Sequence, residues 1–214
     1  VLTTFAGCKK MDSTYAEFVV TNGRTYAGKP TSLAAYSGKN RIRLAWLRGA
    51  DPNVVSAKVY WNNYQDSLSL NIPESGDTIS IIIGNLEEKQ YTFIVRTYDH
   101  KGNSSIPVEI IGESFAPKYQ TYLVGRTIVS SELTEKGRMI INWGTANLTG
   151  GAYATDVIYT TTGDEQKTVR TSAENTTTEI TDYKPGTTFN YVTVYRPGTK
   201  SIDNFYSGHV TVNV

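Results

Sequence analysis

The sequence is short of cysteine and histidine, and each shortage excludes a class of protein. Cys8 is the only cysteine in 214 residues, so no internal disulfide can form and a secreted disulfide scaffold is excluded. The chain has two histidines, His100 and His209, and no Cys and His residues stand at the close spacing of a structural zinc site. We therefore expect neither a metal nor a cofactor.

Long apolar runs and an excess of one charge are also lacking. Beyond the first eight residues, no apolar run approaches the roughly 20 residues that a transmembrane helix requires. The 21 Lys and Arg residues balance 20 Asp and Glu residues, and the longest basic run is Lys9-Lys10. A nucleic-acid-binding surface would need basic residues clustered on one face. We expect no nucleic-acid partner.

Recognisable catalytic constellations are missing from the sequence. There is no Gly-x-Ser-x-Gly nucleophile elbow, although a Ser-His-Asp triad is defined by geometry and is not decided by counting. A glycosidase needs two carboxylates about 5 to 10 Å apart across a cleft. The adjacent acidic pairs Glu87-Glu88 and Asp164-Glu165 both fall in expected hairpin loops, where solvated charge is the simpler explanation. We predict a protein that is not an enzyme, with a glycoside hydrolase accessory enzyme as the less favoured alternative.

The first eight residues contain the sequence Val1-Leu2-Thr3-Thr4-Phe5-Ala6-Gly7-Cys8, a mildly apolar stretch that ends in two small residues and the cysteine. This pattern is typical of the end of a bacterial lipoprotein signal, and the alternative is a free thiol. Attachment of diacyl or triacyl lipid at Cys8 would supply more than one chain, the condition for stable membrane anchoring. We predict a signal end at residues 1–8 and a tether with a leading strand at residues 9–36.

Short alternating segments begin at Arg41. Ile42, Leu44 and Trp46 would share one face of a strand, with Arg41 and Arg43 on the other face. Similar segments follow, each bounded by turn residues, and no segment shows a helical period. The pattern predicts an all-β chain built as a β-sandwich.

The second half of the chain repeats the first half. Three pairs of landmarks hold a spacing of 97 or 98 residues, which is hard to obtain by chance. We therefore predict two domains of the same fold, at residues 37–115 and 116–214. The paired landmarks are Trp46 with Trp143, Val59 with Val157, and Tyr91 with Phe189.

These landmarks resemble the fibronectin type III pattern, and Tyr183-Lys184-Pro185-Gly186-Thr187-Thr188-Phe189 is similar to the family's Leu-x-Pro-Gly-Thr-x-Tyr. The resemblance implies two consecutive fibronectin type III or immunoglobulin-like β-sandwiches. It also implies a tyrosine corner, in which a Tyr hydroxyl bonds to the backbone a few residues upstream. Tyr91 can make this bond, but Phe189 has no hydroxyl. We expect the second domain to lack the bond.

A closer resemblance covers nearly the whole chain. Cys8-Lys9-Lys10-Met11-Asp12, Gly38-Lys39-Asn40-Arg41-Ile42, Val59-Tyr60-Trp61-Asn62-Asn63 and Asp99-His100-Lys101-Gly102-Asn103-Ser104 resemble a domain-of-unknown-function family of Bacteroidetes surface lipoproteins. The resemblance implies export to the outer membrane and the cell surface, in the setting of glycan uptake, and it supplies no catalytic residues. Asp12-Ser13-Thr14 is similar to the Bacteroidetes O-glycosylation pattern, which implies modification at Ser13.

Aromatic residues are the one enrichment, with 15 Tyr, 3 Trp and 6 Phe. Exposed aromatic side chains concentrate at binding surfaces, and those in loops stack on sugar rings. Tyr64 stands beside Asn62 and Asn63 in an expected hairpin loop, so we predict these three as ligand contacts. Tyr153 and Tyr206, in expected loops of the second domain, receive the same prediction. The alternative is that the tyrosines occur because their shape favours β-strands, with no role in binding.

Together these observations predict a non-enzymatic, lipid-anchored protein of the outer membrane and cell surface. The membrane is the expected partner through the lipid, and a glycan or a surface protein is the expected ligand. The alternative is a purely structural spacer or adhesion protein whose partners are proteins. The two functions differ in whether the aromatic side chains gather on an exposed surface.

Overall fold

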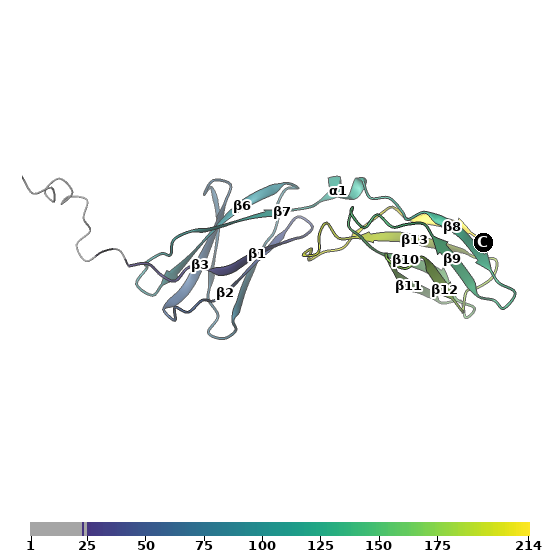
Figure 1. Cartoon of the computed structure of the whole chain (residues 1–214), viewed down its shortest axis with the longest axis horizontal. Coiled ribbons are helices and arrows are strands. Elements are labelled where there is room, and N and C mark those ends of the chain that lie inside the picture. Colours follow the sequence, from purple (N-terminus) through teal and green to yellow (C-terminus); the bar gives the residue numbers. More distant parts are fainter. Residues whose placement is uncertain (1–22, 24) are drawn as a thin grey trace, which may run out of the picture.

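The computed structural model describes residue 23 and residues 25–214, so Cys8 and Ser13 lie outside the described residues. Two β-sandwiches, here domain 1 and domain 2, are arranged end to end, with the short helix α1 (Pro117–Thr121) between them (Figure 1). None of the helices in the described range is long and apolar enough to cross a membrane.

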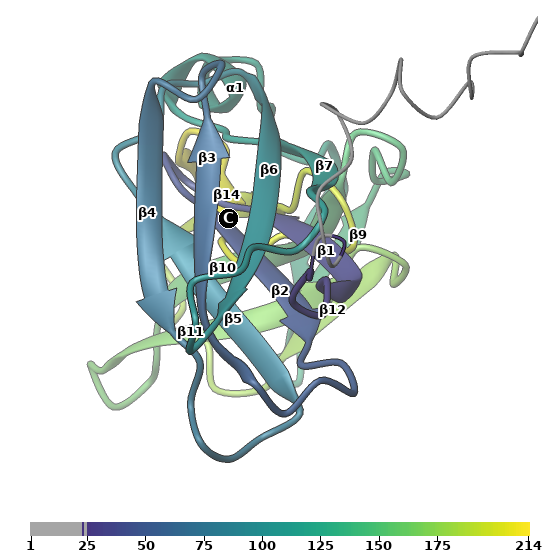
Figure 2. The ribbon, with the colours of Figure 1, turned by 90° about the vertical axis from the view of Figure 1, so that its left-hand side faces the viewer.

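Domain 1 consists of a three-stranded and a four-stranded antiparallel sheet. The strand order is β1-β2-β5 in one sheet and β4-β3-β6-β7 in the other. Figure 2 shows β4, β3 and β6 side by side, seen from the end of the molecule that domain 1 forms. The strands are β1 (Thr31–Ser37), β2 (Ile42–Leu47), β3 (Val54–Trp61), β4 (Asp66–Asn71), β5 (Thr78–Ile83), β6 (Gln90–Asp99) and β7 (Val108–Glu113).

The core of domain 1 follows from the alternation along its strands. Ile42, Leu44 and Trp46 point inward from β2 and are at most 1% exposed. Phe93 and Val95 meet them from β6 of the other sheet, in the same apolar cluster. A fully buried side chain of this size contributes about 1.5–3 kcal/mol of hydrophobic stabilisation, so this cluster holds the two sheets together.

Domain 2 repeats the arrangement. One sheet has the order β12-β9-β8, and the other has the order β11-β10-β13-β14 with β15 also paired to β13. Met139, Ile141 and Trp143 of β9 pack against Val157 and Tyr159 of β10 in its core. The strands are β8 (Ile128–Leu133), β9 (Met139–Trp143), β10 (Ala152–Thr160), β11 (Gln166–Ser172), β12 (Thr177–Ile180), β13 (Thr188–Tyr195), β14 (Phe205–Tyr206) and β15 (Val210–Asn213).

The first sandwich takes in residues from the range that the sequence assigned to a tether and leading strand. β1 pairs with β2 along most of its length, so it is part of the first sheet. Ala27 is 5% exposed and belongs to the core of domain 1. The Gly28 amide donates to the Asp51 carboxylate at 2.8 Å, and Thr97 donates to the Gly28 carbonyl. Domain 1 therefore includes residues upstream of residue 37.

The helix α1 was not expected from the sequence, which shows no helical period. It is a single turn that begins at Pro117, and its N-cap residue Ala116 makes no side-chain bond to it. The Glu88 carboxylate, from the loop before β6, accepts the amides of Lys118 at 2.8 Å and Tyr119 at 2.6 Å. A carboxylate at this position satisfies amides that no helical turn can pair. A contact from a distant loop therefore stabilises this helix. The helix is too short for the periodicity of the sequence to reveal it.

The tyrosine corner takes two forms. In domain 1 the Tyr91 hydroxyl donates to the Glu87 carbonyl at 3.3 Å, as expected. Phe189 makes no such bond, but the expectation that domain 2 lacks a hydroxyl bond in this corner is wrong. Tyr183, at the other end of the same loop, donates to the Thr187 carbonyl. Both bonds join residues four apart and close the loop that precedes β6 or β13. The tyrosine stands at the end of the loop in domain 1 and at its start in domain 2.

Candidate functional site

Three tyrosines form a row on the outer face of the four-stranded sheet of domain 1. Tyr60 of β3 points away from the core because it alternates with buried Val59. The rings of Tyr60 and Tyr64 lie 5.1 Å apart at an angle of 53°. The hydroxyls of Tyr60 and Tyr98 lie 3.1 Å apart, which joins β3 to β6 across the face. We call Tyr60, Tyr64 and Tyr98 the tyrosine row.

Tyr64 reaches this position from an unusual turn. Asn62, Asn63 and Tyr64 all have left-handed backbone, with φ of 48°, 53° and 65°. Asn tolerates this region, but a bulky residue there stores strain of about 1–3 kcal/mol. The side-chain amide of Asn62 donates to the Asp66 carboxylate at 2.6 Å and closes the hairpin. Tyr64 remains 52% exposed, so the strained turn presents its ring to solvent.

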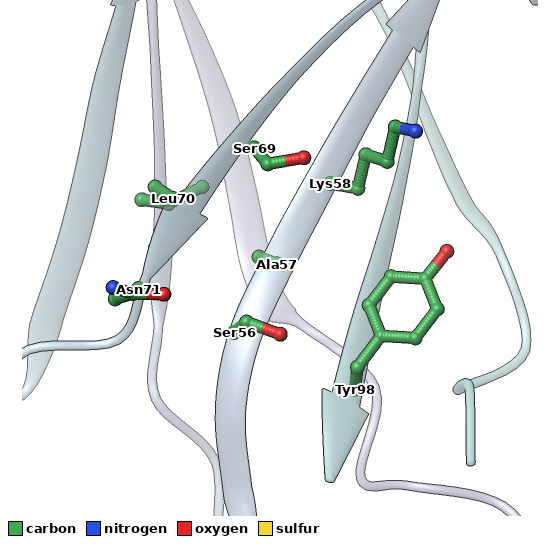
Figure 3. Close-up of a pocket in the computed structure, with 7 residues that line it drawn as sticks. All are labelled: Ser56, Ala57, Lys58, Ser69, Leu70, Asn71 and Tyr98. Carbon is green, nitrogen blue, oxygen red and sulfur yellow. The ribbon is translucent and has the colours of Figure 1, made fainter. Parts of the chain in front are cut away.

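Small polar side chains surround the row. Ser69 stands opposite Lys58 across the β3–β4 pair, and Ser56 stands opposite both Asn71 and Tyr98. Together they line a shallow pocket of about 380 Å³, in which Figure 3 shows Lys58 and Tyr98 on the same side of the strands as the serine hydroxyls.

The chemistry of this surface suits a ligand with both apolar faces and hydroxyl groups. Tyrosine offers rigid amphipathic contact at small entropic cost, and Ser and Asn offer adaptable hydrogen bonds. The ammonium of Lys58 lies 5.1 Å from the centre of the Tyr60 ring, within cation–π range. Lys58 thereby adds a donor beside the aromatic faces.

Burial is the main cause that raises the pKa of Tyr98 to about 12, and the bond to Tyr60 adds to it. The phenol therefore keeps its proton at neutral pH. Tyr60 and Tyr98 each retain both a donor and an acceptor, one of which serves the bond between them. The remaining capacity of each hydroxyl is free to meet a neutral polar ligand.

The structure places the predicted ligand contacts in two separate groups. Asn62, Asn63 and Tyr64 share the β3–β4 turn of domain 1, where the Asn62 amide already serves Asp66. Tyr153 and Tyr206 belong to domain 2, and they lie in strands rather than in the expected loops, at 43% and 40% exposure.

Tyr153 and Tyr206 both act on the charge of Arg170. The main cause of the raised pKa of Arg170 is its hydrogen bond to Asp156, and both tyrosines contribute to it. Phe205, beside Tyr206, is 1% exposed and belongs to the core. Arg170 and Asp156 form an ion pair at 2.6 Å on the β10–β11 ladder.

The sequence prediction missed Tyr60, Tyr98 and Lys58. A signal was present, because Tyr60 and Lys58 alternate with the core residues of β3 and must face outward. Tyr98 could not be associated with them from the sequence, since the β3–β6 register brings it beside Ser56. In the described part of the chain, no three His, Cys, Asp or Glu residues are grouped as a metal site would require.

The two domains are also joined by specific contacts. The Asp203 carboxylate, in the loop between β13 and β14, accepts from Arg41 at 2.5 and 2.9 Å and from the Lys39 amide at 2.8 Å. The Ile202 amide donates to the Ser37 carbonyl at 2.8 Å. These contacts fasten domain 2 to the turn between β1 and β2 of domain 1.

Comparison with solved structures places the fold. The FN1-FN3 domains of chicken CNTN1 are similar at a TM-score of 0.52 and 13% identity, covering 89% of this chain. The chain spans 65% of the length of that solved chain. A two-domain fibronectin type III segment of chicken tenascin matches at a TM-score of 0.33 and 16% identity, covering 86% of this chain and 98% of that one. The prediction of an all-β fold with two consecutive fibronectin type III-like sandwiches is confirmed by the sheets and the first of these matches.

Comparison with curated proteins finds no match to the sequence. The sequence does match a domain of unknown function, DUF4998, and the match extends over residues 8–205. This range takes in domain 1 with the tyrosine row, the helix α1, and domain 2 as far as the first residue of β14. The chain therefore belongs to the DUF4998 family, whose function is unknown.

Proposed function

We propose that this protein is a non-catalytic binding module for carbohydrate, and that the tyrosine row is its binding surface. The observation that carries the proposal is the row itself: a strained turn exposes Tyr64 beside Tyr60, and Tyr60 is bonded to Tyr98. Adjacent aromatic faces bordered by serine hydroxyls and an amide match the alternating apolar and hydroxyl faces of sugar rings.

The shape of the surface favours an extended ligand. The pocket beside the row is shallow and lies along β3 and β4, and its polar members come from both strands. Such a surface can meet several sugar units in sequence, each through a ring face or a few hydrogen bonds. It offers no enclosed site for a reacting bond, which supports binding in preference to catalysis.

A glycan array probed with soluble protein from Lys9 onward tests this proposal. We expect binding to one class of glycan, and the Tyr64→Ala variant to bind about tenfold more weakly, since one aromatic contact contributes roughly 1–1.5 kcal/mol. Tyr122→Ala is the matched control, because Tyr122 is 82% exposed and lies in the linker. Undiminished binding by Tyr64→Ala would exclude the tyrosine row as the site.

A spacer is the second candidate function, and the contacts between the domains favour it. The contacts at Arg41, Asp203 and Ser37 connect loops of the two domains. Two domains joined by a flexible linker alone would not make such contacts. A protein that only holds a partner away from a surface would bind no glycan on the array. In that case we would expect the tyrosine row to contact a protein partner instead of a glycan.

We also propose that the protein is displayed at the bacterial outer membrane through lipid on Cys8. The support is the sequence pattern at residues 1–8, and the residues concerned lie outside the described part of the chain. The Cys8→Ala variant should leave the membrane fraction and appear in the soluble fraction with both domains folded. If Cys8→Ala stays in the membrane fraction, another attachment must exist.

A further inference from the structure

A groove of about 720 Å³ lies beside the junction, on the side of domain 2. Phe115 and Tyr119, from the segment that links the domains, line one part of it, and Leu148, Tyr153 and Pro197 line another. Ligand pockets of this size are common at domain boundaries and are mostly apolar with a few polar groups. The groove is distinct from the tyrosine row, which lies on domain 1.

The walls of the groove are held in place by close backbone contact. A Cβ atom on Gly151, whose φ is +87°, would lie 2.2 Å from the Arg196 carbonyl oxygen. The Arg196 amide donates to the Gly151 carbonyl at 2.9 Å, so the loop before β10 is fastened to the segment after β13. Phe115 and Tyr119 pack edge to face on buried Phe205. The groove is therefore formed without a ligand, which reduces the entropic cost of binding.

Arg196 determines the charge of the groove. Its guanidinium stacks on Tyr153 at 3.9 Å from the ring centre, and its Nε donates to Asn204 at 2.8 Å. These contacts fix the plane of the guanidinium, while its Nη1 and Nη2 have no hydrogen-bond partner among the residues that the structure describes. Among the described residues, none that lines the groove is acidic, and the nearby Asp203 is engaged by Arg41. An oriented guanidinium with free donors favours a planar anionic group.

We propose that this groove binds a small amphipathic anion, with its carboxylate or sulfonate on Arg196 and its apolar body against Tyr119, Leu148 and Pro197. The inference goes beyond the proposed function, because it concerns another surface and another class of ligand. It does not depend on carbohydrate binding by the tyrosine row.

Two fluorescent probes test the proposal on the full chain. The first, 8-anilinonaphthalene-1-sulfonate, is an aromatic anion, and the second, N-phenyl-1-naphthylamine, has the same rings without the sulfonate. We expect the anionic probe to bind one site more tightly than the neutral probe. Arg196→Gln should weaken the anionic probe about tenfold or more and leave the neutral probe nearly unchanged, since a hydrogen bond to a charged group is lost. Arg196→Lys, which keeps the charge, should weaken it less.

Blocking and location variants complete the test. Thr199→Trp, which places a large ring at an exposed lining position, should abolish binding of both probes. Thr162→Trp, at an exposed position in the turn after β10, should not. Increasing salt should weaken the anionic probe alone, a result that requires no variant to fold. Equal affinity for the two probes, or loss of binding in Tyr64→Ala with retention in Thr199→Trp, would overturn the proposal.

Discussion

Single side chains differ between the two domains at positions that the repeat makes equivalent. Trp143 donates its Nε1 hydrogen to Thr178 at 2.7 Å, and Thr178 also bonds to Thr171. Trp46 is as deeply buried, but its Nε1 has no partner in the described structure. A buried donor without a hydrogen-bond partner costs about 1–3 kcal/mol of folding free energy. The tryptophan at this core position therefore stabilises domain 1 less than its equivalent stabilises domain 2.

Tyr183 allows a direct test at this scale. Tyr183→Phe removes only the hydroxyl that bonds to Thr187, so we expect domain 2 to lose about 1 kcal/mol of unfolding free energy, the usual net value of a hydrogen bond. Hydrogen exchange of the β9 and β13 amides in increasing urea would measure the change. Tyr122→Phe is the control, since that ring is exposed. Unchanged exchange in Tyr183→Phe would show that the corner bond contributes nothing.

At the scale of the element, the β3–β4 hairpin combines stability with a candidate function. Three consecutive left-handed residues are a costly way to connect two strands, and only the two asparagines tolerate this backbone well. The bond from Asn62 to Asp66 offsets part of that cost. A bulky aromatic residue at the third position, despite this strain, suits a surface that uses the ring for binding.

Tyr64→Gly separates the two roles of this hairpin. Glycine accepts a φ of 65° without strain, so we expect domain 1 to become more stable by about 1 kcal/mol while glycan binding is weakened. Tyr64→Ala should weaken glycan binding to the same extent without this gain in stability, because alanine keeps the strain. Urea unfolding of the two variants, followed by the fluorescence of Trp46 and Trp61, would compare them. Equal stability of the two variants would mean that the turn is not strained.

At the scale of the whole molecule, the junction distinguishes this chain from a flexible string of domains. Glu88 of domain 1 caps α1, and Asp203 of domain 2 binds Arg41 of domain 1. Phe115, two residues after β7, packs on Phe205 at 6.2 Å between ring centres. Interfaces between domains in one chain usually permit relative motion, whereas paired charges, a helix cap and an aromatic contact together oppose it.

Asp203→Asn should release this junction. Residual dipolar couplings of backbone amides should fit one alignment tensor for both domains in the native chain and two different tensors in the variant. Asp164→Asn, which breaks an exposed ion pair with Lys184 inside domain 2, is the control and should keep one tensor. A single tensor in Asp203→Asn would show that the other contacts suffice.

Acid should have the same effect as Asp203→Asn. The hydrogen bond from Arg41 is the main cause that lowers the pKa of Asp203 below its usual value of about 3.9. A carboxyl whose pKa is lowered by folding contributes stability above its unfolded pKa, and this is lost as the pH falls through the folded value. We therefore expect the two domains to keep a common tensor above about pH 4 and to separate in more acidic solution.

The strands and the core could be predicted from the sequence because both are local in origin. Alternation alone placed Ile42, Leu44 and Trp46 inside, and the spacing from Trp46 to Trp143 revealed the second sandwich. The helix α1 was missed because one turn is too short to show a period, and it depends on Glu88 from another loop. Tyr206 was assigned to a loop because its two-residue strand is too short to alternate, and Tyr153 because it lies at the very start of β10, which directly follows two glycines.

The amino-acid sequence by itself determined the all-β class and the faces of the strands, since both follow from side chains a few residues apart, and it revealed the repeat through landmarks at one constant spacing. Only the tertiary structure decided which side chains meet. The Tyr60–Tyr98 bond joins residues 38 apart, and the Arg41–Asp203 pair joins residues 162 apart. Such contacts depend on strand register and on the packing of one domain against another, and the local periodicity of the sequence predicts neither. The tyrosine row, the groove and the junction all arise from these distant contacts.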